Sequence, residues 1–448
     1  SIDKGDWTDT DTVIDKIISS EEEIAQKALV DNIWSILTPR QKNHRIDMRI
    51  DRLLFLLILA GICTFQAKAD SAPTTLLYHK VLNEKEAFPE LVADAGLVAD
   101  YTSEGLRITG KEGTIRLDKY YSLGERMIRY HVKFSDDAVA LFKSNTDDFK
   151  LSVDIAHKKV SVATNPETWK TMDFLNSDHE YLIEIYRAYQ KNVVRIVDVY
   201  TGVFDILELT TDGTGGHGTG IENSGFFAGN QHDYYCFGLQ SGTSLLIKQI
   251  SVIAGARDLF LLIYGDSITE PEGYFPSRDY PSAWTQLIMK NVSGEAISSG
   301  RGGCTIIHVL ERIKNELPYI KAKYVMVTIG TNGGNTEENL SDLVEYILSQ
   351  GSIPILNNIP CNESGTQIDV NRTIEKIRQK YNIKGCKFDI ATSINHDGIE
   401  VDKSTMYHED YTGSWGQIYH HPNVKGSLAM YTRTQIDIPE IYDAIYPD

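Results

Sequence analysis

The chain has 448 residues and a formal net charge of −18, with 24% charged and 42% hydrophobic residues. Such an acidic surface repels phosphate groups, which argues against nucleic acid and anionic membranes as partners and favours a neutral substrate. Its five cysteines are too few for a disulfide scaffold at this length. Cys361 and Cys386 each lie beside a predicted strand, so they either pair with each other or remain buried thiols.

The segment 48–69 has the layout of a signal peptide. A basic start at Met48–Arg52 precedes the apolar run Leu53–Cys63, and Ala67-Lys68-Ala69 then supplies a small-x-small cleavage site. The apolar run is too short for a comfortable membrane span, and a buried core helix is the alternative. We therefore expect cleavage near Ala69, a secreted, periplasmic or cell-surface protein, and no membrane span in the mature chain. Residues 1–47 are then an upstream extension, either a translation artefact or a cytoplasmic segment.

Residues 70–256 carry many short alternating runs and no notable helical pattern. In Met127–Phe134, for example, every second residue is apolar, as in a half-buried strand. Similar runs occur at Phe149–Ile155, Lys159–Ala163, Tyr181–Tyr186, Val193–Tyr200, Cys236–Leu239 and Leu245–Ile253. This pattern predicts an antiparallel β-sandwich of jelly-roll type, in which Gly213–Gly220 is a long hairpin tip. The region loosely resembles concanavalin-like and laminin-G-like sandwiches. Its acidic pairs Asp136–Asp137 and Asp147–Asp148 are interpreted as solvated turns rather than calcium sites.

Residues 257–448 alternate between buried strands and helices. The strands are expected at Phe260–Tyr264, Tyr324–Ile329, Ile353–Asn357 and Lys387–Ile390. The helices are expected at Ser282–Lys290, Ile306–Leu317, Glu337–Gln350 and Ile368–Tyr381. Strand–helix alternation with short connections predicts an α/β domain with a doubly wound parallel sheet.

Polar or glycine-rich segments follow the apolar runs of this second domain. The first run ends in Gly265-Asp266-Ser267, and the Tyr324 run ends in Gly330-Thr331-Asn332. Between them lies the glycine-rich turn Ser298–Thr305, whose backbone can approach a ligand closely. Near the C-terminus, Tyr419–Gly426 brings His421 ahead of a helix. Because ligands of parallel sheets bind at the carboxyl ends of the strands, these segments are expected to form one site.

Serine, glycine, asparagine and histidine in this order resemble the SGNH (GDSL-type) hydrolases, over roughly Asp258 to the C-terminus. The resemblance implies that Ser267 is the nucleophile and that His421 is the general base and later the general acid. It also implies an oxyanion hole made of the Ser267 N–H, the Gly303 N–H and the Asn332 side chain. No organic cofactor and no metal ion are expected, and the histidines 396, 408, 420 and 421 match no ligand spacing.

This sequence departs from the family pattern beside the histidine. The family places an aspartate three residues before it, where this chain has Ile418, which cannot accept a hydrogen bond from the imidazole. Either a backbone carbonyl orients His421, giving a Ser–His dyad, or a nearby carboxylate does. The available carboxylates are Glu409, Asp410, Asp397 and Asp402. The two favoured arrangements are the dyad and a triad that includes Asp410. His420 is a competing base without the following Pro-Asn context. Two smaller departures are Ser298, where the family often has asparagine, and Gly333, where it usually has an acid.

These observations predict a secreted serine esterase that removes acetyl or other short acyl groups, with an acylated glycan or a small ester as its substrate. A lipase, lysophospholipase or thioesterase of the same superfamily is the enzymatic alternative. A glycan-binding protein without activity is the other alternative, motivated by Ile418 at the position of the acid.

Overall fold

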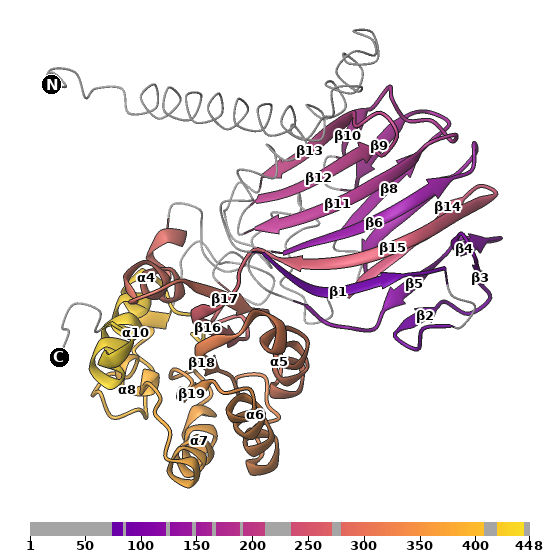
Figure 1. Cartoon of the computed structure of the whole chain (residues 1–448). Helices are drawn as coiled ribbons and strands as arrows, with labels where there is room; N and C mark the ends of the chain where they lie inside the picture. Colours follow the sequence, from indigo (N-terminus) through magenta and orange to yellow (C-terminus); the bar gives the residue numbers. More distant parts are fainter. Residues whose placement is uncertain are drawn as a thin grey trace, which may run out of the picture. The chain divides into compact units, whose positions relative to one another are not determined.

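The computed structural model describes residues 74–83, 87–121, 126–145, 149–163, 167–188, 191–210, 234–270, 279–406 and 419–442 (Figure 1). The predicted signal peptide, the Gly213–Gly220 tip and the pair Asp147–Asp148 lie outside these residues. Among the helices in these ranges, none is both long and apolar enough to cross a membrane.

The N-terminal part of the described chain contains two antiparallel sheets. The first has eight strands in the order β13-β12-β11-β6-β15-β4-β3, with β1 also paired to β15. Its strands are β1 (Thr75–Val81), β3 (Val98–Thr102), β4 (Gly105–Thr109), β6 (Arg126–Phe134), β11 (Glu180–Ala188), β12 (Lys191–Asp198), β13 (Phe204–Thr210) and β15 (Ser244–Ala254). The second has seven strands in the order β10-β9-β8-β7-β14-β5-β2. Its strands are β2 (Leu91–Ala93), β5 (Gly113–Leu117), β7 (Val139–Ser144), β8 (Lys150–Asp154), β9 (Lys159–Val162), β10 (Thr168–Thr171) and β14 (Tyr235–Ser241).

Alternating side chains join the two sheets into a sandwich. Along β6, every second residue from Arg126 to Phe134 is buried. Tyr130 of this strand packs against Phe142 and Phe237 of the other sheet, with ring centroids 4.8 and 5.5 Å apart. Burying a large apolar side chain contributes about 1.5–3 kcal/mol, so this shared core explains why the two sheets stay together. The predicted β-sandwich is confirmed.

The C-terminal part contains a four-stranded parallel sheet in the order β17-β16-β18-β19. Its strands are β16 (Leu259–Gly265), β17 (Ala296–Gly300), β18 (Ala322–Thr328) and β19 (Ile353–Leu356). The helices are α4 (Trp284–Asn291), α5 (Ile306–Ile320), α6 (Glu337–Ser349), α7 (Gln367–Tyr381), α8 (Phe388–Ala391), α9 (Lys403–Met406) and α10 (Val424–Asp437), with short 3₁₀ helices η2 (Tyr280–Ser282) and η3 (Pro439–Ile441). The change from antiparallel to parallel pairing comes between the end of β15 and the start of β16.

Helices cover both faces of this parallel sheet. Leu261 and Ile263 of β16 share one buried cluster with residues of α4, α8 and α10. Leu262 and Tyr264 of the same strand face the other way, into a cluster with residues of α5, α6 and α7. Figure 1 shows α4, α8 and α10 grouped together, apart from α5 and α6. The predicted doubly wound α/β fold is therefore confirmed.

Two local predictions in this domain were wrong. The expected strand at Lys387–Ile390 is the short helix α8, because Phe388 turns inward and packs its ring 5.1 Å from that of Trp284. A short apolar run alone does not distinguish a strand from a buried helical turn. The segment expected to be a turn at Ser298 begins inside β17, a strand of small polar residues that is buried from Ile297 to Gly300.

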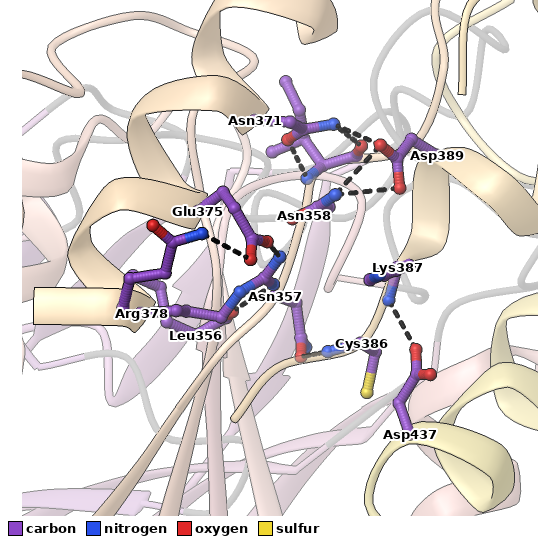
Figure 2. A network of polar contacts seen from close by, with 12 residues as sticks. Leu356, Asn357, Asn358, Asn371, Glu375, Arg378, Cys386, Lys387, Asp389 and Asp437 are labelled. Carbon is purple, nitrogen blue, oxygen red and sulfur yellow. Dashed lines mark hydrogen bonds and ion pairs between the residues drawn. The ribbon is translucent and has the colours of Figure 1, made fainter. Parts of the chain in front are cut away.

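Polar side chains hold the far edge of the sheet to its helices (Figure 2). Asn358, just after β19, donates to both carboxylate oxygens of Asp389 at 2.9 Å, and Asn371 of α7 donates to the same group at 3.2 Å. Arg378 of α7 donates to the Leu356 carbonyl at 3.0 Å. Burial raises the pKa of Asp389, which these amide donors partly offset. The network fixes the loop that leads toward residues 392–406.

The four cysteines in the described ranges are buried free thiols: Cys236, Cys304, Cys361 and Cys386. Cys361 and Cys386 therefore do not form a disulfide with each other, and the second alternative, two buried thiols, is the correct one. Burial raises the pKa of Cys361 to about 12 and that of Cys386 well above its usual value, so both remain neutral.

Candidate active site

Three strands of the parallel sheet end at the same level. Gly265 at the end of β16 lies opposite Gly300 of β17 on one side and Thr328 of β18 on the other. Ser267 follows the first of these ends by two residues, Gly303 the second by three and Asn332 the third by four. The sequence spacing therefore brings all three predicted residues to one edge of the sheet, where ligands of such folds bind.

Glycines allow the turn after β16 to pack tightly against the strand ends. A Cβ atom on Gly265 would lie 2.0 Å from Thr269 Oγ1, and one on Gly300 would lie 2.4 Å from the Thr269 carbonyl carbon. Both distances are far inside van der Waals contact, so larger residues at these positions would displace the turn that carries Ser267.

Ser267 and His421 are in direct contact. His421 Nε2 lies 2.8 Å from Ser267 Oγ, although 154 residues separate the two in the sequence. Both side chains are buried, with exposed fractions of 8% and 6%. A hydrogen bond of this length between a hydroxyl and an imidazole is what proton transfer from a nucleophilic serine requires.

The residues after His421 fix its position. Asn423 caps α10, its side-chain oxygen accepting from the Gly426 N–H at 3.0 Å, and its own N–H donates to the Thr405 carbonyl at 3.0 Å. A Cβ on Gly426 would lie 2.0 Å from that same carbonyl oxygen. The His-Pro-Asn-Val-Lys-Gly sequence thus starts the helix and seats it on α9, which holds His421 at the end of its loop.

His420 makes a different contact. Its Nδ1 lies 3.0 Å from a carboxylate oxygen of Glu363, while its ring packs 4.4 Å from that of His421. Of the two histidines considered as the base, His421 is therefore the one that reaches Ser267.

Asn332 contacts the glycine-rich loop. Its Nδ2 donates to the Cys304 carbonyl at 3.0 Å, and Cys304 directly follows Gly303. Gly303 has φ +70°, a backbone conformation that favours glycine. The structure therefore joins the asparagine segment to the loop that carries the second predicted oxyanion donor.

A buried ion pair connects the serine turn to this loop. Glu270 and Arg301 are fully buried, and Arg301 Nη1 donates to Glu270 Oε1 at 2.7 Å. The other carboxylate oxygen accepts the Gly302 N–H at 2.5 Å. Neither residue was among the site residues predicted from the sequence. The signal in the sequence was an acidic residue three positions after Ser267 and a basic residue two positions before Gly303.

Arg312 of α5 holds two strand ends together from the buried side. It donates to the Gly265 carbonyl and to the Ser299 carbonyl, both at 2.9 Å. Its side chain is fully buried. Like Glu270 and Arg301, it was not among the predicted site residues, because its role depends on contacts between distant segments.

Asp266, directly before the serine, is a buried acid with a strongly shifted pKa. Burial raises its pKa to about 7, although a hydrogen bond from the Ile268 N–H and the nearby Arg312 oppose the shift. The carboxyl group is thus close to the protonation midpoint at neutral pH.

The carboxylates that could orient His421 are only partly covered by the described residues. Asp397 accepts from the Ile399 N–H, and Asp402 accepts from Ser404 and lies 3.6 Å from Lys425 Nζ. Glu409, Asp410 and Ile418 fall outside the described residues. The choice between a dyad and a triad that includes Asp410 stays a prediction.

Within the described ranges, no group of three or more His, Cys, Asp or Glu residues could hold a metal ion. His396 instead lies with Nδ1 3.1 Å from the Ile390 carbonyl, and His408 is outside the described residues.

No protein-family model and no curated protein matches this chain. Among solved structures, a GDSL-like lipase from Bacteroides thetaiotaomicron is 16% identical, with 39% of this chain and 85% of that chain covered and a TM-score of 0.30. The esterase EstA from Pseudoalteromonas sp. is 19% identical, with coverages of 40% and 96% and a TM-score of 0.31. The VIP36 exoplasmic/lumenal domain, bound to Ca²⁺ and Man3GlcNAc, is 13% identical, with coverages of 40% and 90% and a TM-score of 0.31.

These structures represent both groups that the sequence resembles, the GDSL-like hydrolases and the concanavalin-like sandwiches. With identities of at most 19% and TM-scores of 0.30–0.31, the likenesses add no weight to a functional assignment. That assignment depends on the arrangement of the residues themselves.

Proposed function

We propose that this protein is a serine carboxylic ester hydrolase in which Ser267 is the nucleophile and His421 the general base. The observation that carries the proposal is the 2.8 Å contact between Ser267 Oγ and His421 Nε2 at the carboxyl ends of the parallel strands. A serine is weakly nucleophilic on its own, and an adjacent imidazole that takes its proton is the usual means of activation.

In the first half of the reaction, Ser267 Oγ attacks the ester carbonyl carbon and its proton moves to His421 Nε2. The tetrahedral intermediate then breaks its bond to the alcohol oxygen, which leaves with the proton from His421. This yields an acyl-serine and a free alcohol. In the second half, His421 takes a proton from water, the hydroxide attacks the acyl carbon, and Ser267 regains a proton as the acid leaves.

The negative charge on the tetrahedral oxygen needs hydrogen-bond donors. We assign the Ser267 N–H, the Gly303 N–H and Asn332 Nδ2 to this role. An amide nitrogen carries two hydrogens, so Asn332 can donate one to the Cys304 carbonyl and direct the other toward the substrate. Each such donor commonly lowers the activation free energy by about 3 kcal/mol.

The orientation of His421 distinguishes a triad from a dyad. In a triad, replacing the orienting acid by alanine lowers kcat by about 10³- to 10⁴-fold, whereas in a dyad every carboxylate variant keeps most activity. Asp397→Ala and Asp402→Ala serve as matched controls, because those carboxylates bond to Ile399 and to Ser404 and Lys425. Asp410→Ala and Glu409→Ala decide between the two arrangements.

For the substrate, we propose short acyl esters on a neutral, sugar-like alcohol, hydrolysed outside the cell. The net charge of −18 supports an uncharged substrate. The signal-peptide pattern supports secretion, and the β-sandwich supports a glycan only at the level of a fold type.

A panel of nitrophenyl esters from acetate to long acyl chains, together with acetylated oligosaccharides, tests this proposal. Ser267→Ala is the blank. We expect turnover of acetyl esters that the blank lacks. A preference for long chains would point to a lipase or lysophospholipase, and equal rates for the wild type and the blank on every ester would leave a binding protein.

A further inference from the structure

The loop after β5 of the sandwich docks onto a helix of the α/β domain. Tyr120 and Tyr121 in this loop are fully buried, with exposed fractions of 0% and 1%. The Tyr120 N–H donates to Glu311 Oε1 at 3.2 Å, and its carbonyl accepts from Asn315 Nδ2 at 3.0 Å. Both partners belong to α5, and the two domains lie in one compact unit. The backbone of Tyr120 is thereby held on α5 by two hydrogen bonds.

The side chain of Tyr120 reaches two supports of the candidate active site. Its ring centroid lies 5.5 Å from the Arg312 guanidinium carbon, and its hydroxyl lies 3.7 Å from Cys304 Sγ. Arg312 holds the ends of β16 and β17 through the Gly265 and Ser299 carbonyls. Cys304 directly follows Gly303, and its carbonyl accepts from Asn332. One sandwich side chain thus contacts both Arg312, which holds the two strand ends, and the Gly303–Cys304 loop, called the oxyanion loop below.

The surroundings of Arg312 explain why an aromatic ring suits this position. A fully buried guanidinium loses its hydration, and the face of an aromatic ring compensates by electrostatic attraction. Tyr264 supplies a second ring, 5.9 Å from the guanidinium carbon. Its hydroxyl donates to Glu316 at 2.7 Å, which keeps a carboxylate near the cation.

A second sandwich tyrosine orients the first. The ring of Tyr234 stacks on that of Tyr120, with centroids 5.3 Å apart and an angle of 29° between the planes. The Tyr234 hydroxyl donates to the Glu311 carboxylate at 3.0 Å. Burial also raises the pKa of Cys304, so its sulfur is a neutral packing partner rather than a reactive thiolate. These contacts leave Tyr120 with one defined position.

We propose that Tyr120 is a positioning residue for the hydrolase site, and that the β-sandwich is consequently part of the catalytic unit rather than an independent appendage. The proposal rests on the function assigned above. Tyr120 acts through Arg312 and Cys304: it keeps the ends of β16 and β17 and the Gly303–Cys304 loop in the geometry that the transition state needs.

The test replaces Tyr120 in the full chain and compares kcat and KM on an acetyl ester. We expect Tyr120→Leu to lower kcat by about 10- to 100-fold with KM changed less than about threefold, because a small displacement of donors affects the transition state most. Tyr120→Phe keeps the ring over Arg312 and should retain at least about a third of kcat. Tyr120→Met, whose unbranched side chain adapts more readily to an irregular site, replaces the leucine variant if that one does not fold, and the same result is expected.

The control for general destabilisation is Val153→Ala in β8, a truncation in the sandwich core away from the docking loop. It should lower the urea midpoint and leave the kcat of the folded protein unchanged. Wild-type kcat in Tyr120→Leu, or an equal loss in Val153→Ala, overturns the proposal. If the wild type and Ser267→Ala are equally inactive, the esterase assignment itself fails instead.

A double-mutant cycle shows whether Tyr120 acts through the oxyanion loop. Tyr120→Leu combined with Asn332→Ala should lose little more kcat than Asn332→Ala alone, since both changes disable the same group of donors. Losses that multiply would show that Tyr120 acts independently of that loop and would contradict the proposed route.

Discussion

Both domains bury a carboxylate beside arginine, but with different consequences. In the sandwich, Glu184 of β11 accepts from Arg129 at 2.7 Å and from Arg195 at 2.5 Å, within the paired strands of one sheet. In the α/β domain, Glu270 and Arg301 lie at strand ends, beside the glycine-rich loop. A buried ion pair therefore does not identify a catalytic site by itself. What distinguishes the Glu270–Arg301 pair is that it lies next to the proposed nucleophile and the loop of the proposed oxyanion hole.

Antiparallel and parallel sheets also differ in where they place polar side chains. Along an antiparallel strand, polar residues alternate with buried ones, so they spread over the outer face of the sheet. In the parallel sheet, the strands are buried on both faces, and polar side chains concentrate where the strands end. Ser267, Gly303 and Asn332 follow three such ends, whereas Glu184 lies within its strand.

The largest expected effect comes from Ser267→Ala. We expect ester turnover to fall by at least about 10³-fold, because no nucleophile remains for acyl transfer. The free energy of unfolding should change by about 1 kcal/mol or less, the contribution of one hydrogen bond. Turnover and urea unfolding of the same preparation check both statements. Wild-type rates in this variant would exclude Ser267 as the nucleophile.

Asn332→Ala should have the next largest effect. Loss of one oxyanion donor lowers kcat by about 10²-fold or more and leaves KM nearly unchanged, because the donor acts mainly in the transition state. Asn335→Ala is the matched control, since Asn335 lies three residues further on and donates to the Ile329 carbonyl instead. A change confined to KM would make Asn332 a substrate contact.

The sequence predicted the elements whose pattern is local. The alternation of β6 and the long amphipathic helices α5, α6 and α7 were visible from spacing alone. The strand β17 was not, because Ser298 and Ser299 resemble a turn until Arg312 and Thr269 supply hydrogen-bond partners for its buried groups. The sandwich strands β1 to β5, β7, β10 and β13 were also missed, most of them short and irregular in pattern.

The same distinction holds within the candidate site. Ser267, Asn332 and His421 stand in short motifs, so a family resemblance could single them out, and the structure brings Ser267 and His421 into contact. Glu270 and Arg301 are 31 residues apart, and Tyr120 and Cys304 are 184 apart. No periodicity connects such pairs, because their contact is created only when the domains fold.

A matched pair of variants tests the comparison between the two buried ion pairs. Glu270→Gln and Glu184→Gln each leave buried arginine without a full countercharge, so each should lower the free energy of unfolding by about 3–5 kcal/mol. Only Glu270→Gln should also lower the kcat of the folded protein, by about tenfold, because it loosens the hold on Gly302. Equal kcat values in the two variants would show that position at the strand end has no catalytic consequence.

The last prediction concerns the pH dependence of stability, and it compares two aspartates whose pKa values shift in opposite directions. Burial raises the pKa of Asp266 to about 7, whereas hydrogen bonds from Thr243 and Ser135 lower the pKa of the exposed Asp137 in the sandwich. A raised acid pKa means that the folded state holds its proton more tightly. The stability due to protonated Asp266 is therefore complete below about pH 4 and is lost progressively up to about pH 7.

Asp266→Asn removes this titration while keeping an oxygen for the Ile268 N–H. Its free energy of unfolding relative to the wild type should rise between pH 4 and pH 7, by at most about 4 kcal/mol, and level off above. Asp137→Asn should behave in the opposite sense. It lowers stability at pH values above the pKa that Asp137 has in the unfolded chain. This loss disappears as the pH falls through the lower pKa that Asp137 has in the folded protein. Urea titrations of the three proteins from pH 4 to 8 measure the first trend, and their extension below pH 4 measures the second. If the difference between Asp266→Asn and the wild type stays flat over this range, the carboxyl group before Ser267 is not the buried, proton-retaining acid that its surroundings imply.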